Sequence, residues 1–228
     1  MFIKKFAKVV KHNNKNTVCP PGKLPISSGL PNIIVASTMR SGTHLLIDTI
    51  LNNFTRYKNR PLYIDLDQYA LKKKDPLLLR HINGAIIKTH YPQIDIPDFD
   101  VYLRSITSKG NYIVLTPIRN LDDVTVSLKK FGNKSKHTGI SEQQYTIFKD
   151  YWIKYNPKNI LFSDLVSRDS YKSCIKSISI YIDEPSNKEI IYPPCKNTKR
   201  FYVYFWKFLT RSIGRYSPIV NTTISFKK

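Results

Sequence analysis

The apolar positions of the chain fall into short runs and into longer stretches with helical spacing. Three short runs rich in branched side chains, Ile33–Ala36, Gly84–Ile87 and Tyr112–Leu115, are typical of buried strands. A fourth run of this kind is Asn159–Phe162. Because polar residues follow each run, we expect four short strands whose ends carry the chemistry of the molecule.

Apolar residues recur with a helical period between these runs. We expect helices over His44–Phe54, over Leu121–Phe131 with Asn120 as its N-cap, over Glu142–Tyr155, and from the fourth strand through about Tyr181. Strands that alternate with helices predict a three-layer α/β fold, in which helices flank a central, mostly parallel sheet. Ligands of such folds bind at the carboxyl ends of the strands.

The length of 228 residues favours one domain with tails. We expect a basic tail and loop over 1–31, one domain over 32–216 and a tail over 217–228. No apolar stretch approaches the roughly 20 residues that a membrane span needs. The basic start, Met1–His12, lacks the features of a signal peptide and is expected at the protein surface, with weak membrane-surface contact as the alternative.

The cysteines and the charge suggest a compartment and a class of partner. Cys19, Cys174 and Cys195 are too few and too widely spaced for a disulfide framework or a zinc motif, which favours a reducing, cytoplasmic setting. The formal charge of +21 points to anionic partners or to a generally Lys-rich composition. Lysines are scattered along the chain, so specific nucleic-acid binding is not favoured.

The segment Ser37–Thr43 links the first strand to the first helix. Backbone N–H groups at a helix start bind phosphate oxygens, and Gly42 allows a ligand to approach the backbone closely. Ser41 and Thr43 add hydroxyl groups, and Arg40 adds a permanent positive charge. The segment lacks the leading glycine and the lysine of a Walker A motif. Alone, it is also compatible with an ordinary capped helix start.

Two further groups of residues follow strand ends. Arg119 and Ser127 combine a planar cation with a hydroxyl two helical turns later, which suits a phosphate beside the helix, although Arg119 could instead pair with Asp122 or Asp123. His90 could act as a general base at neutral pH, whereas a lone histidine is more often structural.

These segments together resemble the cytosolic-type sulfotransferases over roughly residues 32–183. Arg40–Leu45 is similar to the family's donor loop, Lys-Ser-Gly-Thr-Thr-Trp, and Lys88–Pro92 matches Lys-Thr-His-x-Pro. Arg119–Ser127 matches Arg-Asn-Pro-x-Asp-x-x-x-Ser with the interval preserved, and Phe162–Leu165 is similar to Tyr-Glu-Asp-Leu. The three main motifs also occur in the family's order.

The sequence departs from the family pattern in two places. Arg40 replaces the lysine of the donor loop, so this side chain can act through charge and hydrogen bonds but not as a proton donor. The late family segment Arg-Lys-Gly-x-x-Gly-Asp-Trp is echoed only by Arg211–Tyr216.

The resemblance implies a P-loop NTPase-like sulfotransferase fold and a donor, 3′-phosphoadenosine 5′-phosphosulfate, with no metal. It implies that His90 takes the proton of an acceptor hydroxyl while Arg40 and Lys88 stabilise charge on the sulfuryl group. The 3′-phosphate would lie against Arg119 and Ser127. The donor-binding residues that it implies are Arg40, Ser41, Gly42, Thr43, His44, Arg119, Ser127, Phe162, Arg211 and Gly214.

Two other functions remain open from the residues alone: a P-loop small-molecule kinase, and a non-enzymatic module that binds nucleic acid or another polyanion. For a sulfotransferase we expect the acceptor to be a glycan or a small alcohol, and the positive charge favours an acidic one. Variable loops at 57–75, 91–102 and 134–142 are expected to form the acceptor pocket. The sequence does not reveal the identity of the acceptor or the oligomeric state.

Overall fold

The computed structural model describes residues 29–59, 62–131 and 140–192. The expectations for Arg211, Gly214, the start Met1–His12 and the tail 217–228 fall outside these ranges, as do Cys19 and Cys195. Among the residues that are described, no helix is long and apolar enough to cross a membrane.

The centre of the molecule is a parallel sheet of five strands in the order β2-β3-β1-β4-β5. In its register, Val35 of the central strand lies opposite Lys88 on one side and Leu115 on the other. The predicted three-layer α/β architecture is confirmed. The strands are β1 (Asn32–Ala36), β2 (Leu62–Asp65), β3 (Ala85–Thr89), β4 (Tyr112–Ile118) and β5 (Lys158–Leu161).

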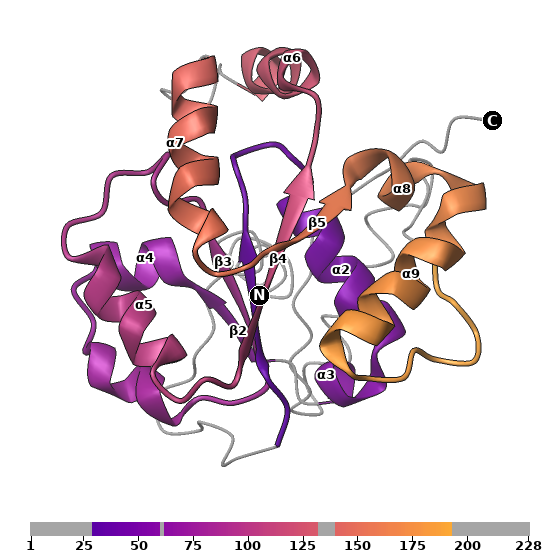
Figure 1. The fold of residues 1–228 in the computed structure, drawn as a ribbon, viewed down its shortest axis with the longest axis horizontal. Helices are drawn as coiled ribbons and strands as arrows, with labels where there is room; N and C mark the ends of the chain where they lie inside the picture. The colour runs from indigo at the N-terminus through magenta and orange to yellow at the C-terminus, as the bar shows by residue number, and fades with distance from the viewer. Residues whose placement is uncertain (1–28, 60–61, 132–139, 193–228) are drawn as a thin grey trace, which may run out of the picture.

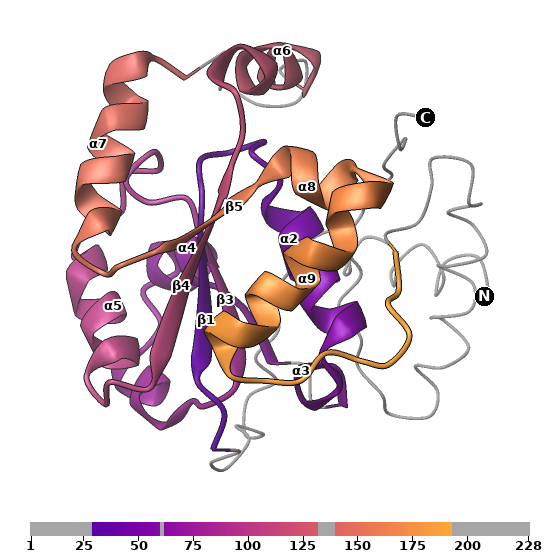
Figure 2. The same cartoon turned by 45° about the vertical axis from the view of Figure 1, so that its right-hand side comes forward.

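Helices cover both faces of the sheet (Figures 1 and 2). Alternation along β1 divides the core, because Ile33 and Val35 pack towards one face while Ile34 and Ala36 pack towards the other. The first face is covered by α2 (Thr43–Asn53), α3 (Thr55–Asn59), α8 (Phe162–Val166) and α9 (Arg168–Ile182). The second face is covered by α4 (Leu66–Leu71), η1 (Pro76–His81), α5 (Phe99–Thr107) and α7 (Glu142–Ile153).

The remaining helix, α6 (Leu121–Phe131), lies beyond the carboxyl end of β4, at the top of Figure 1. Its range is the predicted one. Asn120 caps it as expected, since the Asn120 carboxamide oxygen accepts a hydrogen bond of 2.8 Å from the backbone N–H of Asp122.

Several expected boundaries were wrong. The fourth predicted strand ends at Leu161, and Phe162 is the first residue of α8. The helical segment that follows is two helices, because Ser167 ends α8 and its side chain caps α9. The ranges 57–75 and 91–102, expected as variable loops, contain β2, α4 and the start of α5.

The connections place a switch in direction at the centre of the sheet. The chain leaves β1 for α2 on one face, whereas it leaves the neighbouring strand β3 for α5 on the other. In open α/β sheets, ligands bind where adjacent strands send their connections to opposite faces. The fold therefore predicts a ligand site at the carboxyl ends of β1 and β3.

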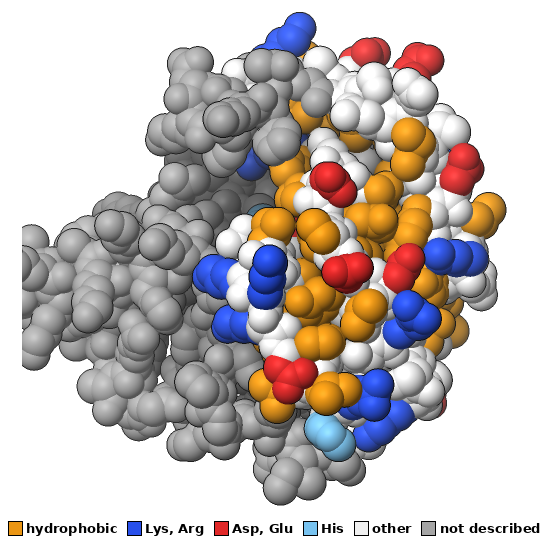
Figure 3. All heavy atoms as spheres, turned by 90° about the vertical axis from the view of Figure 1, so that its left-hand side faces the viewer, with side chains coloured by type: hydrophobic (Ala, Val, Ile, Leu, Met, Phe, Trp, Pro, Cys, Tyr) orange, Lys and Arg blue, Asp and Glu red, His pale blue; other side chains and the backbone are white. Residues whose placement is uncertain are grey.

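The outer side of η1, α5 and α7 is not uniformly basic. Figure 3 shows acidic, basic and apolar side chains interleaved over this side. Leu77 and Leu78 of η1, Val101 of α5 and Ile147 of α7 are among its exposed apolar residues. Most of the charge of +21 comes from lysines and arginines outside the described ranges.

Candidate functional site at the carboxyl edge of the sheet

The loop after β1 begins α2 without a side-chain cap. Gly42 is the N-cap residue in a left-handed conformation, with φ of 110°, and no side chain accepts a hydrogen bond from the first turn of the helix. The neighbouring hydroxyl groups form hydrogen bonds within the loop. Ser41 Oγ donates to the carbonyl oxygen of Thr38 at 2.7 Å, and Thr43 Oγ1 lies 2.6 Å from Ser37 Oγ. The loop is therefore preorganised, and the backbone N–H groups of the helix start are its anion-binding feature.

Phe162 packs directly on Gly42. A Cβ atom at position 42 would lie 2.7 Å from Cδ2 of the Phe162 ring, so only glycine fits beneath this ring. The guanidinium carbon of Arg119 lies 4.3 Å from the centre of the same ring. Phe162 was expected to stack on adenine, and in the structure its ring lies against Gly42 and Arg119.

Arg40, Arg119 and Ser127 meet beside this ring. Arg119 Nη1 donates to the backbone oxygen of Arg40 at 3.1 Å, and Arg40 Nε donates to Ser127 Oγ at 3.1 Å. The expected pairing of Arg119 with an acidic neighbour is weak, because its Nε lies 4.0 Å from the carboxylate of the exposed Asp123. Nε of Arg119 is a buried donor that has no hydrogen-bond acceptor within the described ranges.

The two guanidinium groups are close enough to affect one another. Partial burial, and then the charge of Arg119, lower the pKa of Arg40 below its usual value. An anion placed between two such cations would relieve their repulsion and satisfy the buried Nε of Arg119. This corner of the site is suited to a phosphate or sulfate group.

His44 is the second residue of α2 and lies within range of both halves of the site. Burial lowers its pKa to about 4, and the charges of Lys88 and then Arg40 contribute in the same direction. His44 is therefore neutral at physiological pH. It can offer a hydrogen bond to a ligand but no positive charge.

His90 follows β3 and is held against the end of β1. Its Nδ1 lies 2.7 Å from the backbone oxygen of Ser37, and Ser37 N donates to the Thr89 oxygen at 3.1 Å. Because a carbonyl oxygen can only accept, Nδ1 must carry a hydrogen, and in the neutral ring Nε2 carries the lone pair. This is the tautomer that a general base acting through Nε2 requires.

Lys88 is held by two carboxylates. Its Nζ donates to Asp65 Oδ2 at 3.1 Å and to Asp67 Oδ2 at 3.2 Å, and the ammonium group is buried with both carboxylates. An ammonium held by two carboxylates has its charge neutralised locally. Lys88 is thus part of a buried ionic cluster beside His90, which also reaches His44 electrostatically.

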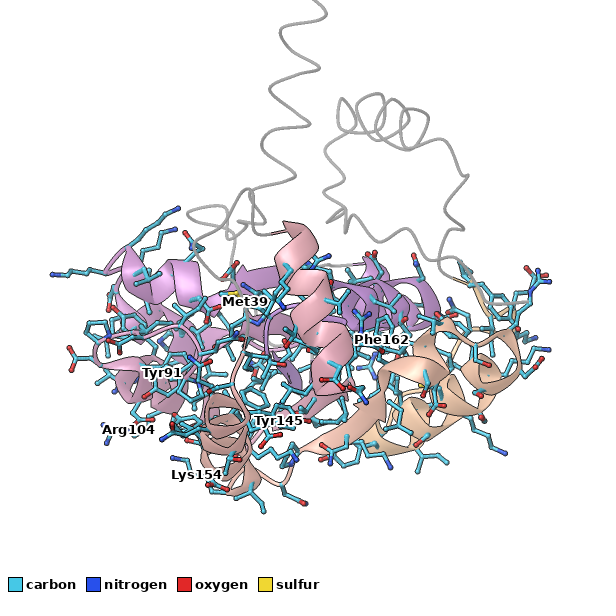
Figure 4. All side chains as sticks on the ribbon, turned by 90° about the horizontal axis from the view of Figure 1, so that it is seen from above. Met39, Tyr91, Arg104, Tyr145, Lys154 and Phe162 are labelled. Atoms are coloured by element: carbon cyan, nitrogen blue, oxygen red, sulfur yellow. The ribbon has the colours of Figure 1, made fainter. Side chains whose placement is uncertain are left out.

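The other side of His90 is aromatic. The Tyr91 ring stacks on Phe99 at 4.1 Å, and Trp152 Nε1 donates to the Tyr91 oxygen at 2.8 Å. Figure 4, which looks down on the carboxyl edge, shows Met39 and Tyr91 to one side of α6 and Phe162 to the other. One side of this edge thus holds Arg40, Arg119 and Phe162, and the other side is rich in tyrosine.

Two groups of contacts at the carboxyl edge of the sheet hold most of the expected residues that the structure describes. Arg40, Gly42, Arg119, Ser127 and Phe162 form contacts at one end, and His44, Lys88 and His90 lie at the other. Sequence reasoning missed three residues that hold this arrangement. They are Ser37, Asp65 and Asp67. Asp65 ends a strand that was not predicted and Asp67 lies two residues later, and that position was their main signal.

Comparison with protein-family models finds no match for this chain, and no curated protein matches it either.

Proposed function

We propose that the protein transfers a sulfuryl group from 3′-phosphoadenosine 5′-phosphosulfate to an acceptor hydroxyl, on a P-loop-like sulfotransferase fold. The observation that carries the proposal is the meeting of Arg40, Ser127, Arg119 and Phe162 around the start of α2. These residues come from three motifs that lie far apart in the sequence, one of which contributes both Arg119 and Ser127. A bisphosphorylated nucleotide needs two anion sites at a fixed separation, and this edge offers two.

The two anion sites would divide the donor between them. The uncapped N–H groups after Gly42 would hold the 5′-phosphate, with His44 as a neutral hydrogen-bond partner. Arg119 and Ser127 would hold the 3′-phosphate, with the unsatisfied Nε of Arg119 as one donor. Arg40 lies between them, since its side chain contacts Ser127 while its backbone belongs to the donor loop.

The reaction needs alignment and charge stabilisation more than covalent catalysis. The acceptor oxygen attacks sulfur as the bond between sulfur and the bridging phosphate oxygen breaks, and His90 Nε2 takes the hydroxyl proton. The products are the sulfated acceptor and 3′-phosphoadenosine 5′-phosphate. Arg40 stabilises the negative charge that the leaving phosphate gains. Because an arginine stays protonated, that phosphate leaves without receiving a proton from it.

Ligand-dependent stability tests this function against its two alternatives. A ligand present at 100 times its Kd stabilises a protein by about 2.7 kcal/mol. We expect 3′-phosphoadenosine 5′-phosphate to raise the Tm, and ATP with magnesium and a mixed oligonucleotide to leave it nearly unchanged. A rise only with ATP and magnesium would identify a kinase-like site, and a rise only with the oligonucleotide would identify a nucleic-acid-binding module.

A pair of variants locates the response within the molecule. Arg119→Gln should abolish the shift caused by 3′-phosphoadenosine 5′-phosphate. Arg104→Gln should preserve it, because Arg104 lies on α5, where its Nε donates to the backbone oxygen of Asp100 at 3.3 Å. Equal shifts in both variants would place the nucleotide elsewhere and contradict the proposal.

A further inference from the structure

We propose that Asp67 is the positioning residue of the base, and that Lys88 acts as the counter-ion of Asp67 instead of contacting the sulfuryl group. This inference rests on the proposed function for its catalytic meaning, whereas the positioning itself can be tested without any reaction. Asp67 is the second residue of α4 and is fully buried. Its carboxylate contacts three consecutive residues, Lys88, Thr89 and His90.

The contacts of Asp67 determine where the chain leaves β3. Oδ1 accepts from Thr89 Oγ1 at 2.7 Å, and both carboxylate oxygens accept from the backbone N–H of His90, at 3.1 and 3.0 Å. Thr89 Oγ1 in turn accepts from the backbone N–H of Tyr91 at 3.1 Å. Charge-assisted bonds of this kind are short and strong, so one carboxylate holds the main chain on both sides of the base.

The ring of His90 is then fixed from the opposite side. Nδ1 donates to the Ser37 oxygen at the end of β1, while the main chain of His90 is tied to Asp67 at the start of α4. Two strands on either side of β3 thus contribute one anchor each. Loss of the Asp67 anchor would free the backbone of His90 to shift, and the ring would lose its alignment with Ser37.

The cluster is not explained by stability. Two carboxylates and one ammonium leave a net negative charge in a buried place, and burial raises the pKa of Asp67 while Lys88 opposes that effect. The second carboxylate, Asp65, contacts Lys88 and also caps α4 through Gln68 N. Asp65 therefore provides a matched control for Asp67.

The direct test is the tautomer of His90, read from its ring nitrogen shifts by NMR in the full chain. The unsubstituted protein should show the neutral ring with hydrogen on Nδ1. Asp67→Asn should give a mixture of both tautomers, because its amide group cannot accept hydrogen bonds from all of these donors. Asp65→Asn should preserve the original spectrum, since asparagine also caps a helix. An unchanged His90 spectrum in Asp67→Asn would overturn the proposal.

A second pair keeps the test valid if Asp67→Asn fails to fold. Thr89→Val removes one donor to Asp67 and the acceptor for Tyr91 N while conserving shape, and Thr89→Ser restores the hydroxyl. We expect the tautomer signal of His90 to change in the valine variant and to return in the serine variant. Equal spectra in the two variants would contradict the positioning role.

Measurements of kcat and KM test the role of Asp67 in catalysis. Misplacement of a catalytic group by about 1 Å can cost on the order of 100-fold in rate, so kcat should fall by about 10- to 100-fold in Asp67→Asn with the KM for the donor unchanged. Asp75→Asn, at the cap of η1 and outside this cluster, should retain kcat. A protein that never transfers a sulfuryl group, but whose His90 tautomer still depends on Asp67, would refute the proposed function and not the positioning. A normal kcat in Asp67→Asn would refute the positioning role in catalysis.

Discussion

Two of the buried polar clusters among the described residues differ in charge and in place. Around Asn53, the carboxamide donates to the Thr49 oxygen, the Tyr171 hydroxyl and the Ile191 oxygen, and it accepts from Ile191 N at 2.8 Å. This cluster is uncharged and ties α2 and α9 to the segment that follows them. Around Asp67, two carboxylates and an ammonium lie at the carboxyl edge of the sheet.

The uncharged cluster holds chain segments together, whereas the charged cluster lies at the candidate site. A neutral, fully bonded amide can fix a chain segment at little electrostatic cost. Buried charges are expensive even when paired, and perturbed titratable groups gather at functional sites. Hydrogen bonding alone therefore does not mark a site in this protein. Charge, together with a place at the switch point of the sheet, does.

The largest expected effect is on catalysis at the charged cluster. His90→Ala should lower kcat by about 10²- to 10⁴-fold, the usual loss for a missing general base. Binding of 3′-phosphoadenosine 5′-phosphate, measured by calorimetry, should persist. Lost nucleotide binding with intact folding would show that His90 belongs to the nucleotide site and does not act as the base.

The neutral cluster should respond in stability. Asn53→Ala removes the acceptor of the Ile191 N–H and one of several partners of the Tyr171 hydroxyl, and an unsatisfied group costs about 1–3 kcal/mol, so unfolding should become easier by about 1–3 kcal/mol. Urea unfolding measures this loss. The partly exposed neighbour Asn52 is the control, and Asn52→Ala should change little. A loss of kcat in folded Asn53→Ala would blur the distinction between the clusters.

His44 should make stability depend on pH on the charged side. Its folded pKa of about 4 lies below the unfolded value of 6.5, so the unfolded chain binds more protons between these values. The stability that neutral His44 contributes is present above pH 6.5 and is lost as the pH falls towards 4, by about 3 kcal/mol in total. His44→Gln should flatten this dependence in unfolding measured from pH 7.5 to 4.5.

The exposed His81 at the end of η1 is the matched control for His44. His81→Gln should leave the pH dependence of unfolding as it is. An equally steep dependence in His44→Gln would mean that other groups account for the acid sensitivity.

The smallest effect compares glycines. Gly42→Ala places a Cβ against Phe162 at a φ of +110°, whereas Gly110→Ala meets nothing within 4 Å at a φ of +69°. Strained backbone costs about 1–3 kcal/mol, so both variants should lose stability, and Gly42→Ala should lose more. Only Gly42→Ala should also weaken nucleotide binding. Equal losses in Tm would show that the Phe162 ring moves aside easily.

The sequence predicted more of the residues around Arg119 than of the residues around His90. Arg40 and Arg119 could be found because each follows a strongly apolar strand, and Ser127 because it lies on the periodic helix that follows Arg119. Asp67 could not, because it follows a strand of four residues and contacts residues more than twenty positions away. The ion pairs of Lys88 with Asp65 and Asp67 could not be predicted for the same reason. The helix α5 was missed although its buried positions follow a helical period, at Phe99, Tyr102, Leu103 and Ile106.

The most direct test of the account is whether the protein recognises a 3′-phosphate. Calorimetry should compare 3′-phosphoadenosine 5′-phosphate with adenosine 5′-phosphate in the unsubstituted protein and in Ser127→Ala. Hydrogen bonds to a charged group contribute about 1.5–3 kcal/mol, so the 3′-phosphate should tighten binding by about 10- to 100-fold, and the gain should shrink in the variant. Equal affinities for the two nucleotides in the unsubstituted protein would contradict the account.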